Sequence, residues 1–326
     1  MREHKLSFVV TARNESASVL QATIQRLLET SSRYVKEIVV IDDGSDLPVT
    51  CAHYDVLLIR NPEPIGVSRS RRYGASMATG DVLVWLDGHM TFSPDWLDLM
   101  LAHVDSGALL CSAFWDYAQS TCHCWGADFV WCGERNYVAH RYPGFGLRHR
   151  TRFPGEGAVE VPMIIGACYM LRRDSYERLG GFSPLFRVWG ADEQDLSARA
   201  WIGGIGVKCV TRARVGHLWR PSFPYPVQFE HLEFNQLVML RTVFEEATVG
   251  MLEEYFQPVP VQVQKWLDEA RIAEWRTTVQ ACRQLSDADF FRRFSAAASL
   301  PFRRPSRWPS VAGRAREVLR RYAFRR

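Results

Sequence analysis

The sequence predicts an α/β fold in which a mostly parallel, Rossmann-like sheet is flanked by helices. In the first ninety residues, short apolar runs rich in β-branched residues alternate with helical patterns, as in parallel strands joined by crossover helices. The runs at residues 37–41 and 82–86 are each followed directly by an acidic residue. Because such sheets bind ligands beyond the carboxyl ends of their strands, we expect a functional site at that edge.

The N-terminal half supplies these elements in order. Residues 6–11 predict a buried strand, and the polar turn Asn14-Glu15-Ser16 starts a helix over residues 19–28. Further strands are predicted at residues 37–41, 56–59 and 82–86, and a further helix at residues 67–78.

The second half predicts a less regular region and a helical end. Residues 111–157 are aromatic, contain Gly, Cys and His, and have little periodicity, so we expect irregular strands and loops there. A helix over residues 190–202 begins in acids, and a strand over residues 207–210 leads towards His217. We also predict a strand at residues 163–171 and helices at residues 94–104, 174–179, 229–256 and 259–294.

These elements suggest three segments. The first, residues 1–255, would be a catalytic domain with a nucleotide-binding half (1–110) and an acceptor half (111–255). A helical extension at residues 256–302 and a basic tail at residues 303–326 would follow.

The composition is that of a folded protein. Of the 326 residues 47% are hydrophobic, and no apolar run approaches the roughly 20 residues of a membrane-spanning helix. The N-terminus does not resemble a signal peptide, so we expect a cytoplasmic protein whose eight cysteines are reduced. A metal cluster of Cys122, His123, Cys124 and Cys132 is the alternative, but the spacing fits no standard zinc template.

The basic tail has a marked charge. Residues 303–326 contain nine arginines and one acid, a local charge of +8, although the whole chain carries only +4. Such a segment can lie on an anionic bilayer, which would make the protein peripheral to the inner face of the membrane. A solvated, unstructured terminus is an equally good interpretation, whereas nucleic-acid binding is not expected because no reading module accompanies the charge.

A metal site is predicted where the strand at residues 82–86 ends. Asp87 and His89 are two residues apart, so on an extended segment their side chains share a face. A carboxylate with imidazoles suits a borderline divalent cation such as Mn²⁺ or Zn²⁺. His217 is the third candidate ligand, although an isolated Asp-x-His is more often a solvated strand end and a lone His a structural residue.

Motifs in a fixed order carry a family resemblance. They are Val10-Thr11-Ala12-Arg13-Asn14-Glu15, Ile38-Val39-Val40-Ile41-Asp42-Asp43-Gly44-Ser45, Gly66-Val67-Ser68-Arg69-Ser70-Arg71-Arg72-Tyr73-Gly74-Ala75, Ala78-Thr79-Gly80-Asp81 leading to His89, Gly166-Ala167-Cys168, Trp189-Gly190-Ala191-Asp192-Glu193-Gln194-Asp195 and Gly216-His217-Leu218-Trp219-Arg220. Over residues 6–255 the chain resembles the GT-A glycosyltransferases, both family 2 and the polypeptide N-acetylgalactosaminyltransferases. The resemblance implies the GT-A fold and a nucleotide-sugar donor, UDP-linked by expectation.

The resemblance also implies a donor site. Asp42 and Asp43 would accept hydrogen bonds from the base and ribose, although Asp-Gly-Ser is also an ordinary turn. Arg69 would contact the nucleotide; the alternative is a solvated helix face, an interpretation that suits Arg71 or Arg72. Thr11 and Asn14 would shape the base pocket or cap a strand end. Arg220 would contact the diphosphate, and Asp87, His89 and His217 would bind Mn²⁺ or Mg²⁺.

Two acids are the catalytic candidates. By register with family 2, Glu193 would be the base, and Asp192 would hold the acceptor or the donor sugar. The polypeptide-modifying relatives have Asn at the second position and transfer with retention, so the carboxylate of Glu193 favours inversion. Both acids are alternatively capping residues of the helix. Trp189 would stack on the sugar or be structural. An acceptor groove, or simply core, is expected from Trp115, Tyr117, Trp125, Phe129, Trp131 and Tyr137.

We therefore expect a metal-dependent hexosyl- or N-acetylhexosaminyltransferase that acts on a glycan, a lipid-linked glycan or a peptide. We expect it to be of bacterial envelope type and to act by inversion. The alternatives are a retaining polypeptide-type transferase and a non-catalytic nucleotide-sugar-binding protein. A nucleotidyltransferase is disfavoured because the N-terminal region lacks a Gly-rich phosphate loop with a basic residue.

Overall fold

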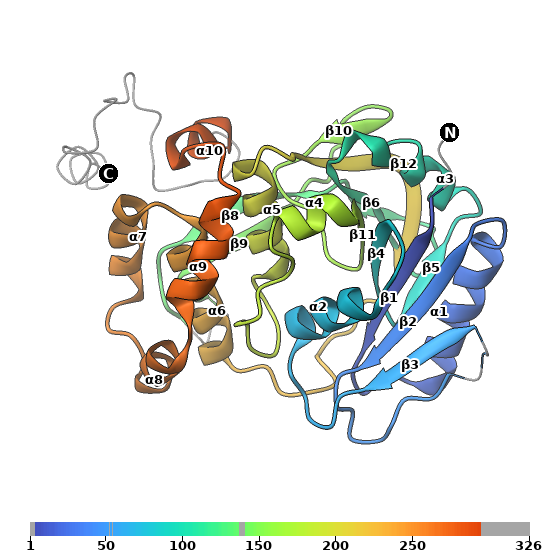
Figure 1. The fold of residues 1–326 in the computed structure, drawn as a ribbon, viewed down its shortest axis with the longest axis horizontal. Helices are drawn as coiled ribbons and strands as arrows, with labels where there is room; N and C mark the ends of the chain where they lie inside the picture. The colour runs from blue at the N-terminus through green and yellow to red at the C-terminus, as the bar shows by residue number, and fades with distance from the viewer. Residues whose placement is uncertain (1–3, 52, 54, 137–140, 295–326) are drawn as a thin grey trace.

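The computed structural model describes residues 4–294 except residues 52, 54 and 137–140 (Figure 1). The predicted basic tail lies outside the described residues, as does Tyr137, so the expected membrane contact stays a prediction. Within the described part of the chain, no helix combines the length and apolarity needed to cross a membrane.

The N-terminal half forms the parallel part of the sheet, with the strands in the order β4-β1-β2-β3. Its first strand is buried at every residue, as its apolar sequence predicts. All six elements predicted in this half are present: β1 (Leu6–Ala12), α1 (Ala17–Thr30), β2 (Lys36–Asp42), β3 (Val56–Arg60), α2 (Val67–Met77) and β4 (Val82–Asp87).

The order of these strands defines the binding edge. The connection from β1 to β2 through α1 moves along the sheet in one direction, and the connection from β3 to β4 through α2 returns past β1 in the other. Because both crossovers are right-handed, α1 and α2 lie on opposite sides of these strands (Figure 1). Ligands of α/β sheets bind where the connections diverge in this way, here at the ends of β1 and β4. Thr11 and Asp87 lie opposite each other at this point.

The second half continues the same sheet in the order β10-β12-β6-β11-β4. The strand β11 is antiparallel to both neighbours, and it is shorter than predicted, because residues 163–167 precede it without strand structure. The predicted strand at residues 207–210 is longer, since β12 continues through a register shift between Val210 and Arg214 to His217. The strands are β5 (Met90–Phe92), β6 (Leu109–Asp116), β7 (Cys122–Cys124), β8 (Ala127–Cys132), β9 (Gly144–His149), β10 (Ala158–Glu160), β11 (Cys168–Arg172) and β12 (Val207–His217).

Short helices complete the second half. The helix predicted at residues 94–104 is shorter than expected and is followed by a separate 3-10 turn. The helices are α3 (Trp96–Leu101), η1 (Val104–Ser106), α4 (Arg173–Arg178), α5 (Asp192–Ile202), α6 (Phe229–Val243), α7 (Glu246–Leu252), η2 (Glu253–Phe256), α8 (Val261–Glu269), α9 (Ile272–Ala281) and α10 (Asp287–Phe294).

The C-terminal helices share the hydrophobic core of the preceding chain. In α10, Phe290 and Phe294 are buried and their rings contact Phe129 of β8. Phe291 contacts Phe145 of β9 in the same way. The region predicted as a helical extension is therefore continuous in packing with the rest, and the domain boundary at residue 255 stays a prediction.

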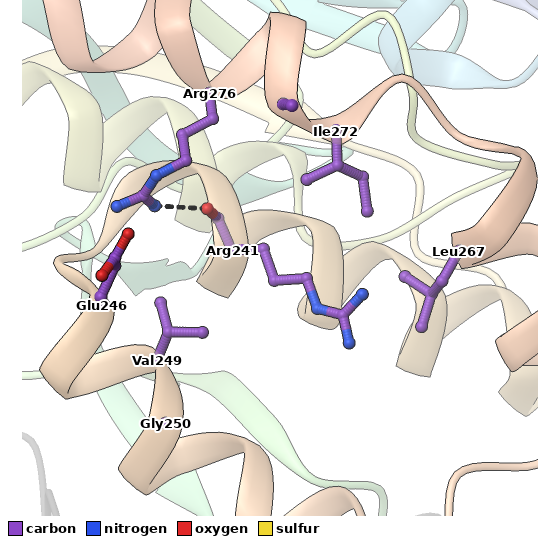
Figure 2. A pocket seen from close by; sticks show the side chains of 8 residues that line it. Arg241, Glu246, Val249, Gly250, Leu267, Ile272 and Arg276 are labelled. Atoms are coloured by element: carbon purple, nitrogen blue, oxygen red, sulfur yellow. Dashed lines mark hydrogen bonds between the residues drawn. The ribbon is translucent and has the colours of Figure 1, made fainter.

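A cavity of about 490 Å³ lies among α6, α7, α8 and α9 (Figure 2). Arg276 donates a hydrogen bond of 2.5 Å to the backbone carbonyl of Arg241 at its wall. None of the predicted site residues lines this cavity. It is lined by Arg241, Glu246, Val249, Gly250, Leu267, Ile272, Ala273 and Arg276.

Candidate functional site

The three predicted metal ligands come together at the end of β4. Asp87 ends β4, His89 immediately precedes β5, and His217 ends β12. Because β5 pairs with β12, the fold brings His217 beside residues that lie far from it in the sequence. One potential ligand atom from each residue lies within 4.8 Å of the other two, the sole cluster of this kind that the described residues form.

The electrostatics of the cluster suit a divalent cation. Burial raises the pKa of Asp87, but the hydrogen bond with His217 and the charge of Arg71 outweigh it, so the pKa is lowered and the carboxylate is ionised. Burial lowers the pKa of His217 despite the opposing charge of Asp87, which keeps this imidazole neutral at pH 7. An ionised carboxylate and neutral imidazoles are the forms that bind metal, and this mixed oxygen and nitrogen set fits Mn²⁺.

Arg71 is the central cation of the site, and the prediction that it faces solvent was wrong. Its side chain is only 4% exposed. One guanidinium nitrogen lies 3.1 Å from Asp87, and another pairs with Asp192 and lies 3.1 Å from Glu193. A single buried cation therefore joins a metal ligand to both predicted catalytic acids.

The α2 sequence contained a signal for this placement. Arg71 precedes Gly74 and Ala75 by three and four residues, so the three share one face of the helix. Gly74 and Ala75 are small, and α2 packs on β1 through that face. A run of three arginines in four positions hid this periodicity. Arg72 is likewise not a purely solvated residue, since it donates to the carbonyls of Gly180 and Phe182.

The two acids of α5 differ in accessibility. Asp192 is 1% exposed and pairs with Arg71, and its second oxygen has no partner among the described residues. Glu193 is 12% exposed. Burial and the charge of Asp192 raise the pKa of Glu193, while Arg71 opposes the rise. Glu193 is therefore the acid that solvent or an acceptor reaches.

The turn before α5 is held in place by α6. Ala191 has φ +69°, a conformation that non-glycine residues rarely adopt outside functional sites. The Asn235 side chain on α6 accepts from the backbone N–H of Arg187 at 2.7 Å and donates to the carbonyls of Trp189 and Gly190. These bonds fix the entry into α5, and so they fix Trp189 and the two acids that follow it.

The acids at the end of β2 are engaged by the protein itself. Asp42 is buried and accepts a 2.6 Å bond from Arg60 and a backbone bond from Ser45. Asp43 is buried and accepts from Ser70, Asn61 and the backbone N–H groups of residues 65 and 66. The bond from Ser45 to Asp42 is what the turn interpretation predicts, whereas the partners of Asp43 lie on later segments of the chain. The expected contacts with base and ribose stay a prediction.

The remaining donor-side residues lie around the same edge. Thr11 is almost buried near the end of β1, and Asn14 follows in a turn with φ +53°. Arg69, in the first turn of α2, donates from Nε to the carbonyl of Phe186 at 3.1 Å. Arg220 lies beyond His217 on the loop of residues 218–228.

Three consecutive residues after β1 hold that loop. The Arg13 guanidinium lies 4.5 Å from the centre of the Tyr225 ring, and Asn14 donates a 2.8 Å bond to the carbonyl of Pro224. Glu15 pairs with Arg220. The loop residue Phe223 also contacts Trp189. No periodicity in the sequence marks Arg13, Glu15 or Tyr225, because their roles arise only when two distant irregular segments meet.

Of the residues predicted to form an aromatic groove, Phe129 is buried, and the others that the structure describes are partly buried. Phe129 and Trp131 both pack on the buried Phe145, so the core interpretation holds for them. Two exposed aromatic residues lie beside predicted site residues. They are Trp219, which contacts His217, and Phe223, which contacts Trp189, with 48% and 45% of their surface exposed.

All eight cysteines are free thiols, as expected. Cys122, Cys124 and Cys132 belong to no metal-type cluster that the described residues form. Burial raises the pKa of Cys124 well above its usual range, so this thiol is protonated at neutral pH.

Comparison with known families identifies the chain. The model of Glycosyl transferase family 2 matches residues 7–180, more than half of the sequence. The chain belongs to this family. A second match, to the N-terminal domain of galactosyltransferase, covers residues 156–220 and includes the α5 acids, His217 and Arg220.

The relatives of this family 2 chain include animal enzymes. Polypeptide N-acetylgalactosaminyltransferase 5 of Caenorhabditis elegans is 28% identical over 247 residues, which cover 68% of this chain and 38% of that protein. Human polypeptide N-acetylgalactosaminyltransferase 16 is 28% identical over 260 residues, covering 77% and 46%. The chain thus spans less than half the length of these relatives. Their animal origin gives no support to the expected bacterial envelope role.

A solved structure confirms the predicted GT-A fold. The crystal structure of GalNAc-T7 with UDP, GalNAc and Mn²⁺ matches with a TM-score of 0.74 and 19% identity, covering 92% of this chain and 59% of that one. At this identity the likeness is one of fold.

Replacing Asp87 with Asn should remove metal binding from this family 2 chain. The amide keeps the shape of the side chain but loses the anionic ligand, so Mn²⁺ affinity should fall by more than the ~10–100-fold expected when only an outer-shell partner is lost. Isothermal titration of Mn²⁺ into the nucleotide-free protein measures the change. Asp98→Asn, on the partly exposed side of α3, should bind Mn²⁺ as the unsubstituted protein does. Equal affinity in Asp87→Asn would remove Asp87 from the ligand set.

Proposed function

We propose that this protein is a metal-dependent glycosyltransferase that transfers a sugar from a UDP-sugar to a hydroxyl acceptor. The observation that carries the proposal is the convergence of Asp87, His89 and His217 with two acids of α5 where β1 and β4 end. Family 2 membership and the named N-acetylgalactosaminyltransferase relatives support it.

The donor would lie along this edge. A divalent cation held by Asp87, His89 and His217 would neutralise charge on the two phosphates and on the departing nucleotide. The planar guanidinium of Arg220 suits contact with the same anionic group. Thr11, Asn14, Asp42, Asp43 and Arg69 would contact the nucleotide end of the donor, and the Trp189 ring would stack on the sugar.

Glu193 is the proposed base. Its side chain is more exposed than that of Asp192. Its pKa is raised towards neutral pH, and a general base is most efficient when its pKa lies near the working pH. Its carboxylate would take the proton from the acceptor hydroxyl as that oxygen attacks the sugar, which gives inversion. Asp192 would hold Arg71 in position. The names of the relatives favour a peptide acceptor over a glycan or lipid-linked glycan.

Calorimetric titration of UDP and GDP, with and without Mn²⁺, tests the proposed donor. We expect binding of UDP that requires Mn²⁺ and weaker binding of GDP. If UDP binds, hydrolysis of UDP-sugars is measured next. Hydrolysis would indicate an enzyme, whereas binding without hydrolysis would indicate a non-catalytic nucleotide-sugar-binding protein. Absence of binding for both nucleotides at every metal concentration would refute the donor assignment.

The pH dependence of transfer tests the base. Only ionised Glu193 accepts a proton, so transfer should decline as the pH falls and Glu193 becomes protonated. Because the pKa of Glu193 is raised, this decline should begin at a higher pH than for an ordinary Glu, whose pKa is about 4.3. Glu193→Gln should abolish this decline and slow transfer by ~10²–10⁴-fold while UDP affinity is retained. An unimpaired Glu193→Gln variant would favour the retaining, polypeptide-type alternative.

Gly166→Ala tests the position of Glu193 without removing its charge. A Cβ at residue 166 would lie 2.6 Å from Oε1 of Glu193, so the flexible carboxylate must move while the backbone can stay. Since a misplacement of about 1 Å can cost about 100-fold in rate, transfer should slow strongly with little change in Mn²⁺-dependent UDP binding. Gly250→Ala, where a Cβ meets open space in α7, is the matched control and should keep full activity. Normal transfer by Gly166→Ala would mean that Glu193 need not occupy this position.

A further inference from the structure

Glu15 is a buried acid to which the proposed function gives no role. It lies in the turn after β1, and its side chain is 2% exposed. One carboxylate oxygen lies 2.8 Å from Nδ1 of His89. The other accepts from Arg220 and, at 3.2 Å, from the backbone N–H of Ser16. One carboxylate thus contacts a metal ligand on one side and the proposed diphosphate contact on the other.

The contact with His89 determines which ring nitrogen can bind a metal. A carboxylate that accepts at both of its oxygens requires Nδ1 of His89 to be the donor in this contact. The unprotonated nitrogen is then Nε2, whose lone pair is available to a cation. Hydrogen bonds of this kind fix the orientation of a ligating imidazole and raise its basicity.

The contact with Arg220 orients the loop side of the site. Arg220 is 24% exposed and uses one terminal nitrogen for Glu15. Nothing else in the described chain binds its other guanidinium nitrogens, so these can donate to an anionic ligand. The backbone bond of 3.1 Å from Leu218 to the carbonyl of His89 keeps this part of the loop beside the metal ligands.

The space for Glu15 is made by the residue between two ligands. A Cβ on Gly88 would lie 3.3 Å from Cγ of Glu15, closer than ordinary packing allows. Glycine between Asp87 and His89 therefore leaves room for the Glu15 side chain to pass behind the three candidate ligands and reach His89. The three residues 87–89 serve the site together, two as ligands and one by its lack of a side chain.

We infer that Glu15 is a positioning residue, which presents Nε2 of His89 to the cation and holds Arg220 at the rim with the same carboxylate. The inference rests on the proposed function, because it assigns a role within that metal and nucleotide site. It explains why a charged side chain is buried here, where it is paired with a cation and hydrogen-bonded at both oxygens.

Glu15→Gln is the decisive substitution because it keeps the size of the side chain and changes only its donors and acceptors. If its single oxygen accepts from Arg220, its NH₂ group faces Nδ1 of His89. That nitrogen must then be unprotonated, which moves the ring proton to Nε2, the atom required by the metal. We expect Mn²⁺ affinity to fall by ~10–100-fold in nucleotide-free protein.

Two measurements test the role. Calorimetry of Mn²⁺ binding gives the affinity of each variant. ¹⁵N spectra of histidine-labelled, metal-free protein give the tautomer of His89, whose signals are assigned by their absence from the spectrum of His89→Gln. We expect Nδ1–H in the unsubstituted protein and Nε2–H in Glu15→Gln. Arg220→Ala should leave the affinity for Mn²⁺ alone near normal but weaken UDP binding in the presence of Mn²⁺.

Glu233→Gln is the matched control, since Glu233 is also a fully buried acid held by an arginine, Arg135, but lies on α6 outside the metal cluster. It should bind Mn²⁺ normally. Normal Mn²⁺ affinity of Glu15→Gln, or the Nε2–H tautomer in the unsubstituted protein, would overturn the inference. The tautomer of the unsubstituted protein tests the inference even if Glu15→Gln fails to fold. Absence of Mn²⁺ and UDP binding in the unsubstituted protein would instead refute the proposed function.

Discussion

The site depends on one buried cation, the guanidinium of Arg71. It neutralises carboxylates that come from the end of β4 and the start of α5, two elements more than a hundred residues apart in the sequence. Buried carboxylates without such a partner would be strongly destabilising. Three acids around one arginine still leave net negative charge, which favours a divalent cation at Asp87. Burial, together with the charge of Asp192, raises the pKa of Glu193.

Arg71 also connects the two halves of the fold. Its helix packs on β1, whereas the acids that it binds begin a helix whose entry is fixed by Asn235 of α6. The nucleotide side and the acceptor side are therefore aligned by ion pairs and hydrogen bonds as well as by the shared sheet. The C-terminal helices contribute in turn, because α6 packs against α8 and α9.

Short-range patterns predicted the first half of the fold well, since each of its strands is a continuous apolar run that ends in polar residues. The family resemblance, and not these patterns alone, placed His217 in one site with Asp87 and His89, because a lone histidine near a strand end is more often a structural residue. The patterns did not reveal Arg71, because a run of arginines on a helix usually faces solvent. They did not reveal Glu15 or Tyr225 either, because Glu15 contacts Arg220 and Tyr225 contacts Arg13 only where the turn after β1 meets a distant loop. Ala191 shows a similar limit, since its left-handed backbone follows a turn that Asn235 of a distant helix holds, and its own sequence does not mark it.

The attachment of the loop at residues 218–228 to three successive side chains has a consequence for protein engineering. Arg13, Asn14 and Glu15 each hold a different loop residue, so the short turn and the long loop form one interlocking unit. A chimaera that receives this loop from another transferase without the matching turn would lose the paired contacts between the two segments. Recombination boundaries in this protein are therefore better placed so that both segments are exchanged as a pair.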